Sequence, residues 1–91
     1  MQKYLIERAI SNVGAMSDAE LCGAAKTSND ALSQLAPKVQ WQHSYVAGDK
    51  TFCIYLAESE DAIRKHSELS GFPANAITEI RTIIDPTTAN H

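Results

Sequence analysis

The residues of this chain that could do chemistry are histidine, cysteine, tyrosine and glutamate side chains scattered along its length. The candidates for a metal site are His66, His43, Cys53, Glu7 and Tyr45. Imidazole and thiolate groups suit nickel, copper or zinc, and a carboxylate either binds such an ion or orients a histidine that does. No pair of these residues stands at a recognised ligand spacing, so they indicate a divalent transition metal without specifying which one.

His66 is the strongest single candidate because it falls within the apolar stripe of an expected helix. It lies between Ile63 and Leu69, where a leucine would be ordinary. One interpretation is a core histidine that is hydrogen-bonded to a backbone carbonyl or a carboxylate. The other is a metal ligand or a proton carrier.

Glu7 and Cys53 also have structural interpretations. Glu7 lies on a strand expected to be central, where a charge is costly unless it is paired. Its candidate partners are Arg8, Arg81 and His66. Cys53 lies on another central strand, where cysteine is commonly a small buried hydrophobic residue. Both residues therefore fit a structural role as well as a metal site.

The composition excludes several classes of function. The chain has 91 residues, which predicts a single domain over residues 1–91. The formal charge of −3 argues against a nucleic-acid partner. No run of about 20 apolar residues is present, so we expect no membrane partner. Cys22 and Cys53 form no paired motif, and a reducing cytoplasm is the expected compartment.

Local signals place six elements along the chain. Ser17 and Glu20 form a capping box that begins a helix, and Pro37 ends it. Ser59 caps a second helix, which ends at Gly71. The expected elements are strands 3–10, 39–47, 50–57 and 76–84, with helices 18–35 and 60–70.

This order predicts an α+β protein with a ferredoxin-like βαββαβ sandwich. Its four strands form one antiparallel sheet, and both helices lie on one face. Right-handed crossovers place the first and third strands in the centre. The other face of the sheet is left open, and in a domain this small it commonly pairs with a second subunit. We therefore expect a homodimer through the open face.

The turn between the second and third strands decides which side chains share a face. A two-residue turn at Gly48-Asp49 pairs Ala47 with Lys50. His43 then lies opposite Ile54, and Tyr45 lies opposite Phe52. A three-residue turn would move every side chain of strand 39–47 to the other face.

The third strand has one plainly apolar set of alternate residues, which we place beneath the helices: Phe52, Ile54 and Leu56. Cys53 and Tyr55 then point to the open face. With the two-residue turn, the side chains of the second strand that join the helix-covered face are Trp41, His43 and Tyr45. This arrangement separates His43 from Cys53 and directs it toward His66.

Several stretches together resemble a family of small proteins known as the domain of unknown function 4242. The resemblance covers nearly the whole chain and implies a ferredoxin-like fold and a homodimer. It also implies nickel binding, since at least one member is described as nickel-binding and nickel-responsive. The matching positions include Glu7, Tyr45, Cys53, Tyr55, His66 and Asp85. The stretches are IERAI (6–10), SYVAGDKTFCIYLA (44–57), AIRKH (62–66), GFPA (71–74) and ITEIRTIIDPTT (77–88).

Three functional hypotheses follow. The first is a small dimeric metal-binding protein, with nickel as the expected metal, that acts in metal sequestration or response. The second is a small-molecule enzyme, resembling an isomerase or a monooxygenase, with a pocket between sheet and helices. In that case His66, Tyr45 and Glu7 would be the acid and base groups. The third is an interaction module whose polar interior is structural. No catalytic motif decides whether the protein is an enzyme.

Overall fold

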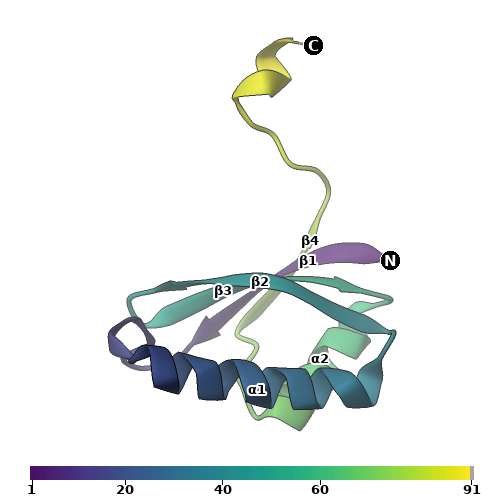
Figure 1. The fold of residues 1–91 in the computed structure, drawn as a ribbon. Helices are drawn as coiled ribbons and strands as arrows, with labels where there is room; N and C mark the ends of the chain where they lie inside the picture. Colours follow the sequence, from purple (N-terminus) through teal and green to yellow (C-terminus); the bar gives the residue numbers. More distant parts are fainter. Residues whose placement is uncertain (91) are drawn as a thin grey trace.

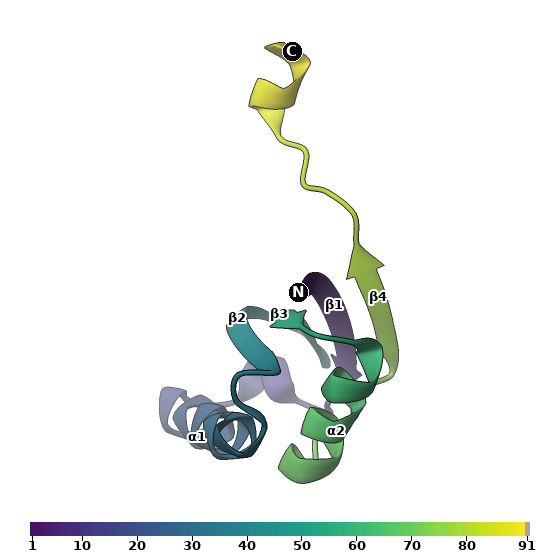
Figure 2. The ribbon, with the colours of Figure 1, turned by 90° about the vertical axis from the view of Figure 1, so that its right-hand side faces the viewer.

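The structure describes residues 1–90 and has the element order that the sequence predicts. In this computed structural model, four antiparallel strands form one sheet in the order β2-β3-β1-β4, and two helices cover one of its faces (Figures 1 and 2). The prediction of a ferredoxin-like α+β fold is therefore confirmed. The elements are β1 (Gln2–Ala9), η1 (Val13–Ala15), α1 (Asp18–Leu35), β2 (Val39–Ala47), β3 (Lys50–Ala57), α2 (Glu60–Ser70), β4 (Ala76–Ile80) and η2 (Pro86–Asn90).

Both helices begin and end where their capping residues predict. The backbone N–H of Glu20 donates to Ser17 Oγ (3.2 Å), and the backbone N–H of Ser17 donates to Glu20 Oε1 (3.1 Å). At the start of α2, Ser59 Oγ accepts from the backbone N–H of Ala62 (3.2 Å). Gly71 ends α2 with a left-handed φ of 79°, which glycine adopts without strain. Within residues 1–90, neither helix is long and apolar enough to cross a membrane.

The core lies between the sheet and the helices and is built on alternate residues of the two central strands. From α2, Ile63 and His66 pack into it, each with no exposed surface. Because side chains alternate along a strand, the core side receives a charged arginine as well as apolar groups. The buried residues of β1 and β3 on this side are Tyr4, Ile6, Arg8, Thr51, Cys53, Tyr55 and Ala57.

The predicted orientation of β3 is wrong. Phe52, Ile54 and Leu56 lie on the open face and are only half-buried. Cys53 and Tyr55 instead point toward the helices and are 4% and 2% exposed. The set Phe52, Ile54 and Leu56 is the more hydrophobic of the two, so hydrophobicity alone predicts the wrong face. Packing decides, because the Tyr55 ring fits against α2 and against the buried side of β1.

The two-residue turn is confirmed, with Ala47 paired to Lys50 and Tyr45 paired to Phe52. Gly48 has a φ of 60°, which suits the tight Gly-Asp turn. His43 lies opposite Ile54, as the turn predicts. Because β3 is reversed relative to the prediction, His43 and Tyr45 lie on the open face rather than toward the core.

Trp41 lies on the helix-covered face, as predicted, but it does not share that face with His43 and Tyr45. The pairing of β2 with β3 shifts between Trp41 and His43, which is the irregularity of a β-bulge. Trp41 therefore lies opposite Tyr55 on the helix-covered side, and the two rings stack with centroids 6.5 Å apart. No glycine or proline marks this bulge in the sequence, so alternation placed Trp41 on the same face as His43.

β4 is shorter than predicted and ends at Ile80 instead of continuing to Ile84. The chain beyond it leaves the body as an extended tail, on the side of the sheet away from both helices (Figures 1 and 2). Ile83 and Ile84 of this tail are 68% and 75% exposed. The apolar content that predicted a longer strand thus lies outside the core.

Candidate functional site

The five predicted metal-site residues are divided between the two faces of the sheet. His66 and Cys53 lie on the helix-covered side, whereas Glu7, His43 and Tyr45 lie on the open face. Across residues 1–90, no three histidine, cysteine or acidic side chains come close enough to hold one metal ion. The structure therefore places His43 beside Tyr45. The five residues do not form a single site within one chain.

His66 is a fully buried histidine with one satisfied ring nitrogen. Its Nε2 lies 3.2 Å from Ser28 Oγ, while its Nδ1 is buried without a partner. The Tyr55 ring lies beside it, with centroids 5.1 Å apart. Burial, together with the positive charge of Arg8, lowers the pKa of His66 to about 4. The imidazole is therefore neutral at pH 7, and its hydrogen-bond partner is a serine rather than the carbonyl or carboxylate that we expected.

Cys53 behaves as the structural interpretation predicts. It is 4% exposed within the core cluster, and its thiol donates a weak hydrogen bond to Thr51 Oγ1 (3.5 Å). Its neighbours in that cluster are apolar or aromatic side chains. A thiol in these surroundings packs as a small hydrophobic group.

Arg8 is the residue on the covered side that the sequence analysis missed. It is 2% exposed, and its Nη1 donates to Ser67 Oγ (3.1 Å), to the Phe72 carbonyl (3.3 Å) and to the Pro73 carbonyl (2.8 Å). Its Nη2 is buried and has no hydrogen-bond partner. The guanidinium carbon lies 5.9 Å from the centre of the Tyr55 ring, which gives a cation–π contact.

The signal that could have found Arg8 is the period of two along the first strand. Tyr4, Ile6 and Arg8 occupy alternate positions and therefore share the core side. The same rule excludes Arg8 as a partner of Glu7, because adjacent residues of a strand point to opposite faces. In the structure Glu7 pairs instead with Lys50, at 3.8 Å between Nζ and Oε1.

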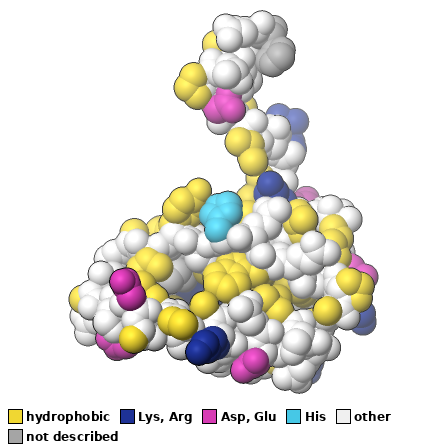
Figure 3. All heavy atoms as spheres, in the orientation of Figure 1, with side chains coloured by type: hydrophobic (Ala, Val, Ile, Leu, Met, Phe, Trp, Pro, Cys, Tyr) yellow, Lys and Arg dark blue, Asp and Glu magenta, His cyan; other side chains and the backbone are white. Residues whose placement is uncertain are grey.

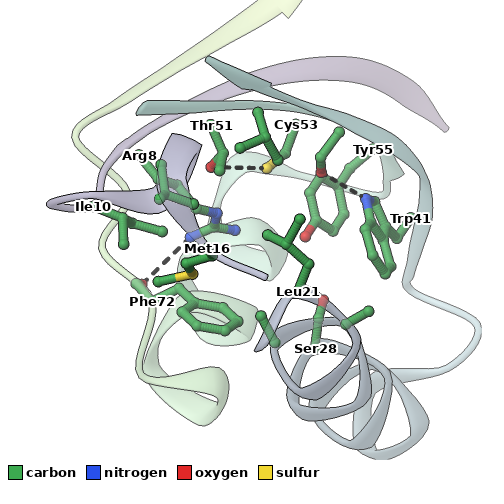
Figure 4. Close-up of a pocket in the computed structure, with 15 residues that line it drawn as sticks. Arg8, Ile10, Met16, Leu21, Ser28, Trp41, Thr51, Cys53, Tyr55 and Phe72 are labelled. Atoms are coloured by element: carbon green, nitrogen blue, oxygen red, sulfur yellow. Dashed lines mark hydrogen bonds between the residues drawn. The ribbon is translucent and has the colours of Figure 1, made fainter. Parts of the chain in front are cut away.

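A cavity of about 240 Å³ lies between α1 and the covered side of the sheet (Figure 4). Its walls are apolar except at a few polar groups, among them the guanidinium of Arg8 and the hydroxyls of Ser28 and Tyr55. Burial raises the pKa of the Tyr55 phenol, so this hydroxyl stays protonated. The lining residues are Arg8, Ile10, Val13, Met16, Leu21, Ala24, Ala25, Ser28, Trp41, Ser44, Val46, Thr51, Cys53, Tyr55 and Phe72.

The loop between β1 and α1 closes one part of this cavity and is held against the hairpin turn. The backbone N–H of Gly14 donates to the Gly48 carbonyl (2.7 Å), and that of Ile10 donates to the Asp49 carbonyl (2.9 Å). A Cβ at Gly14 would lie 2.7 Å from the Gly48 oxygen, so a larger residue would push the loop away. The loop contributes Ile10, Val13 and Met16 to the walls.

The pocket lies where the enzyme hypothesis expects one, but it contains different residues. Tyr45 and Glu7 are on the opposite face of the sheet and do not reach it. His66 does not line the cavity itself. It is hydrogen-bonded to Ser28, which does. Of the three acid and base groups proposed for catalysis, none lines the cavity. Arg8 and Tyr55 are the ionisable groups that do so together with Cys53.

The open face is a mixed apolar and polar surface. His43 and Tyr45 are exposed on β2, with ring centroids 5.1 Å apart in an edge-on arrangement. Tyr45 is 60% exposed. Beside them lie half-buried apolar residues of the central strands, with Ile80 on β4. These apolar residues are Leu5, Phe52, Ile54, Leu56 and Ile80.

Comparisons with known proteins identify a family and a similar fold. A family model described as "Nickel responsive protein SCO4226-like" matches residues 4–80. The structure is similar to the crystal structure of SCO4226 from Streptomyces coelicolor A3(2), with a TM-score of 0.74 and 15% sequence identity. This likeness covers 90% of the present chain and 99% of the other, and at that identity it shows the fold alone. No match was found among curated proteins.

Proposed function

This chain belongs to the SCO4226-like family of nickel responsive proteins, and we propose that it is a small homodimer that binds nickel in nickel sequestration or response. The observation that carries this proposal is the family match over residues 4–80. This match supports the prediction of a family of small nickel-related proteins. Membership of the domain of unknown function 4242 stays a prediction. We place the function in the reducing cytoplasm, where the free thiols of Cys22 and Cys53 would persist.

The helix-covered side does not fit a nickel ion. The unpaired Nδ1 of His66 is an available donor, but the charge of Arg8 acts on the same imidazole and opposes a second cation there. No carboxylate or further imidazole among residues 1–90 joins His66 in a metal-binding group. We therefore assign no metal to this side.

The open face supplies donors of the right kind but too few of them in one chain. His43 presents an exposed imidazole, and nickel accepts imidazole and oxygen donors. Glu7 lies on the same face two strands away, where it is paired with Lys50. A two-fold dimer repeats each residue, so a second copy would double the donors on this face. His43 is the ligand that we propose, with Glu7 and Tyr45 as further donors.

The second copy of the chain is also the occupant that best fits the apolar part of the open face. The tail after β4 projects on this side of the sheet and carries the exposed Ile83 and Ile84. Figure 3 shows hydrophobic side chains along this tail. Two copies that meet through their open faces would each offer the other a tail, which makes a self-complementary interface.

Sedimentation equilibrium tests the dimer. Ile54→Asp places a charge in the middle of the open face, and we expect it to give a monomer with an unchanged circular dichroism spectrum. Lys65→Asp on the exposed side of α2 is the control and should leave the dimer intact. A wild-type chain that sediments as a monomer, or an Ile54→Asp variant that remains dimeric, would contradict the proposed interface.

Calorimetric titration of metal-free protein with nickel tests the function. His43→Ala should weaken binding by at least about tenfold, since even groups that only orient a ligand contribute that much. Gln40→Ala changes an exposed residue of the same strand and serves as the matched control. No heat above that of buffer, or equal affinity in His43→Ala and the wild type, would rule out the proposed site.

A further inference from the structure

The buried charge of Arg8 has no counterion among residues 1–90. Its hydrogen-bond partners are the Ser67 hydroxyl and two backbone carbonyls, all of them neutral. Ion pairs within the described residues join other groups: Lys50 with Glu7, Arg64 with Glu60, and Lys65 with Glu68. A guanidinium does not lose its charge at physiological pH. A buried charge without a partner is costly, so an anion that reaches Arg8 would be stabilised.

The position of this charge points to a ligand rather than to a structural role alone. Arg8 lines the 240 Å³ cavity, and Figure 4 shows its guanidinium extending from β1 into the space between the sheet and α1. Nη1 already makes three hydrogen bonds, whereas Nη2 has none. Arg8 therefore keeps one buried donor group without a partner beside the cavity.

The remaining walls restrict the body of such a ligand. Leu21, Met16 and Phe72 are apolar, and Trp41 adds an aromatic ring. Figure 3 shows hydrophobic side chains gathered in the band between the sheet and α1. An apolar cavity of about 150 Å³ holds one benzene molecule. The present cavity therefore has room for a ring or a short aliphatic chain together with one carboxylate.

The charge count also limits the ligand. One guanidinium in an apolar chamber balances one negative charge, and the other polar groups nearby are neutral hydroxyls such as those of Ser28 and Tyr55. A multiply charged phosphate would need more donors than this. A cation would meet the repulsion of Arg8.

We propose that the cavity between α1 and the sheet is a binding site for a small monocarboxylate with an aromatic or aliphatic body, held by a charge-assisted contact with Arg8. This site is separate from the open face, so it does not depend on nickel. The hydroxyls of Ser28 and Tyr55 are further hydrogen-bonding groups for the bound molecule.

Phenylacetate and its neutral analogue phenylacetamide test this proposal. We expect phenylacetate to bind in calorimetry with a Kd between about 10 µM and 1 mM, within the range open to so small a ligand. The amide should bind at least about tenfold more weakly, because it brings no charge to Arg8. Trp41 is the only tryptophan of the chain and lines the cavity, so its fluorescence should change with the same Kd.

Two variants locate the contact. Arg8→Met removes the charge and should abolish the preference for the acid over the amide. Ala25→Leu fills the cavity from α1 while keeping the arginine at position 8, and it should weaken phenylacetate binding at least about tenfold. Ala19→Leu, on an exposed part of the same helix and outside the cavity, is its control and should bind as the wild type does.

Equal binding of acid and amide, or no saturable signal at about 10 mM phenylacetate, would overturn the proposal. So would undiminished binding in Ala25→Leu, which keeps the test decisive if Arg8→Met fails to fold. Nickel titration of the same variants separates the two sites, since Ala25→Leu should leave nickel binding unchanged.

Discussion

Glu7 and Arg8 are neighbours in the chain, yet they lie on opposite faces of the sheet in very different surroundings. Glu7 is partly exposed and pairs with Lys50 across the open face. Arg8 is 2% exposed and is held by neutral groups beside an apolar cavity. One residue of separation along a strand thus decides between a solvated charge and a buried one. The two proposed sites are therefore separate: His43 and the dimer contact belong to the open face, and Arg8 with its cavity belongs to the covered face.

The largest expected contrast between the faces is in packing. Ile6 is fully buried on the covered side, and Ile6→Ala should lower the free energy of unfolding by about 3–4 kcal/mol through cavity formation. Leu5→Ala shortens a half-buried side chain on the open face. It should lower the free energy of unfolding by only about 1 kcal/mol. Urea unfolding, at protein concentrations low enough to keep the chain monomeric, measures both. Equal losses would show that the open face is as well packed as the core.

The second contrast is between His66 on the covered face and His43 on the open face. The pKa of His66 is about 4 in the folded chain and about 6.5 when unfolded. The unfolded state therefore binds the proton more tightly. The stability that depends on neutral His66 is complete above pH 6.5 and is lost as the pH falls from 6.5 toward 4.

Between pH 7.5 and pH 5 this linkage should remove about 2 kcal/mol from the free energy of unfolding. His66→Gln should abolish that part of the pH dependence. The matched variant on the open face, His43→Gln, should retain it, because the His43 side chain is exposed. Urea titrations at the two pH values give the comparison, and a profile of His66→Gln that follows the wild type would refute it.

The smallest expected effect is at the ion pair of the open face. Glu7 and Lys50 are 34% and 56% exposed at their side chains and are 3.8 Å apart. Such pairs are screened by water, so Glu7→Gln should change the free energy of unfolding by less than about 1 kcal/mol. Thermal unfolding in low and high salt measures it. A loss well above that value would mean that Glu7 is buried in the protein as it exists in solution, as it would be inside a dimer.

Local signals explain the parts of the fold that the sequence predicts correctly. The capping box of Ser17 and Glu20, the cap at Ser59 and the left-handed Gly71 act within a few residues, so the helix bounds follow from them. The Gly48-Asp49 turn likewise sets the pairing of β2 with β3. These features depend on contacts that are close in the chain.

The features that were predicted wrongly depend on contacts between distant segments. The more hydrophobic set of alternate residues in β3 contains Phe52, and only packing against α2 and β1 puts Tyr55 in the core instead. The bulge before His43 separates Trp41, which keeps its predicted face, from His43 and Tyr45, and no glycine or proline signals it. His43 does not approach His66, because the reversed orientation of β3 places His43 on the open face. The burial of Arg8 could have been predicted from its alternation with Tyr4 and Ile6.

The most direct test of the nickel proposal is the pattern of line broadening that nickel causes in the amide NMR spectrum of the protein. Nickel bound at His43 in an octahedral site is paramagnetic and should broaden the amides of residues 42–45 and of their β3 partners first. The amides of α2 around His66 should broaden later and less. Broadening centred on α2, with strand β2 unaffected, would contradict the assignment of nickel to the open face.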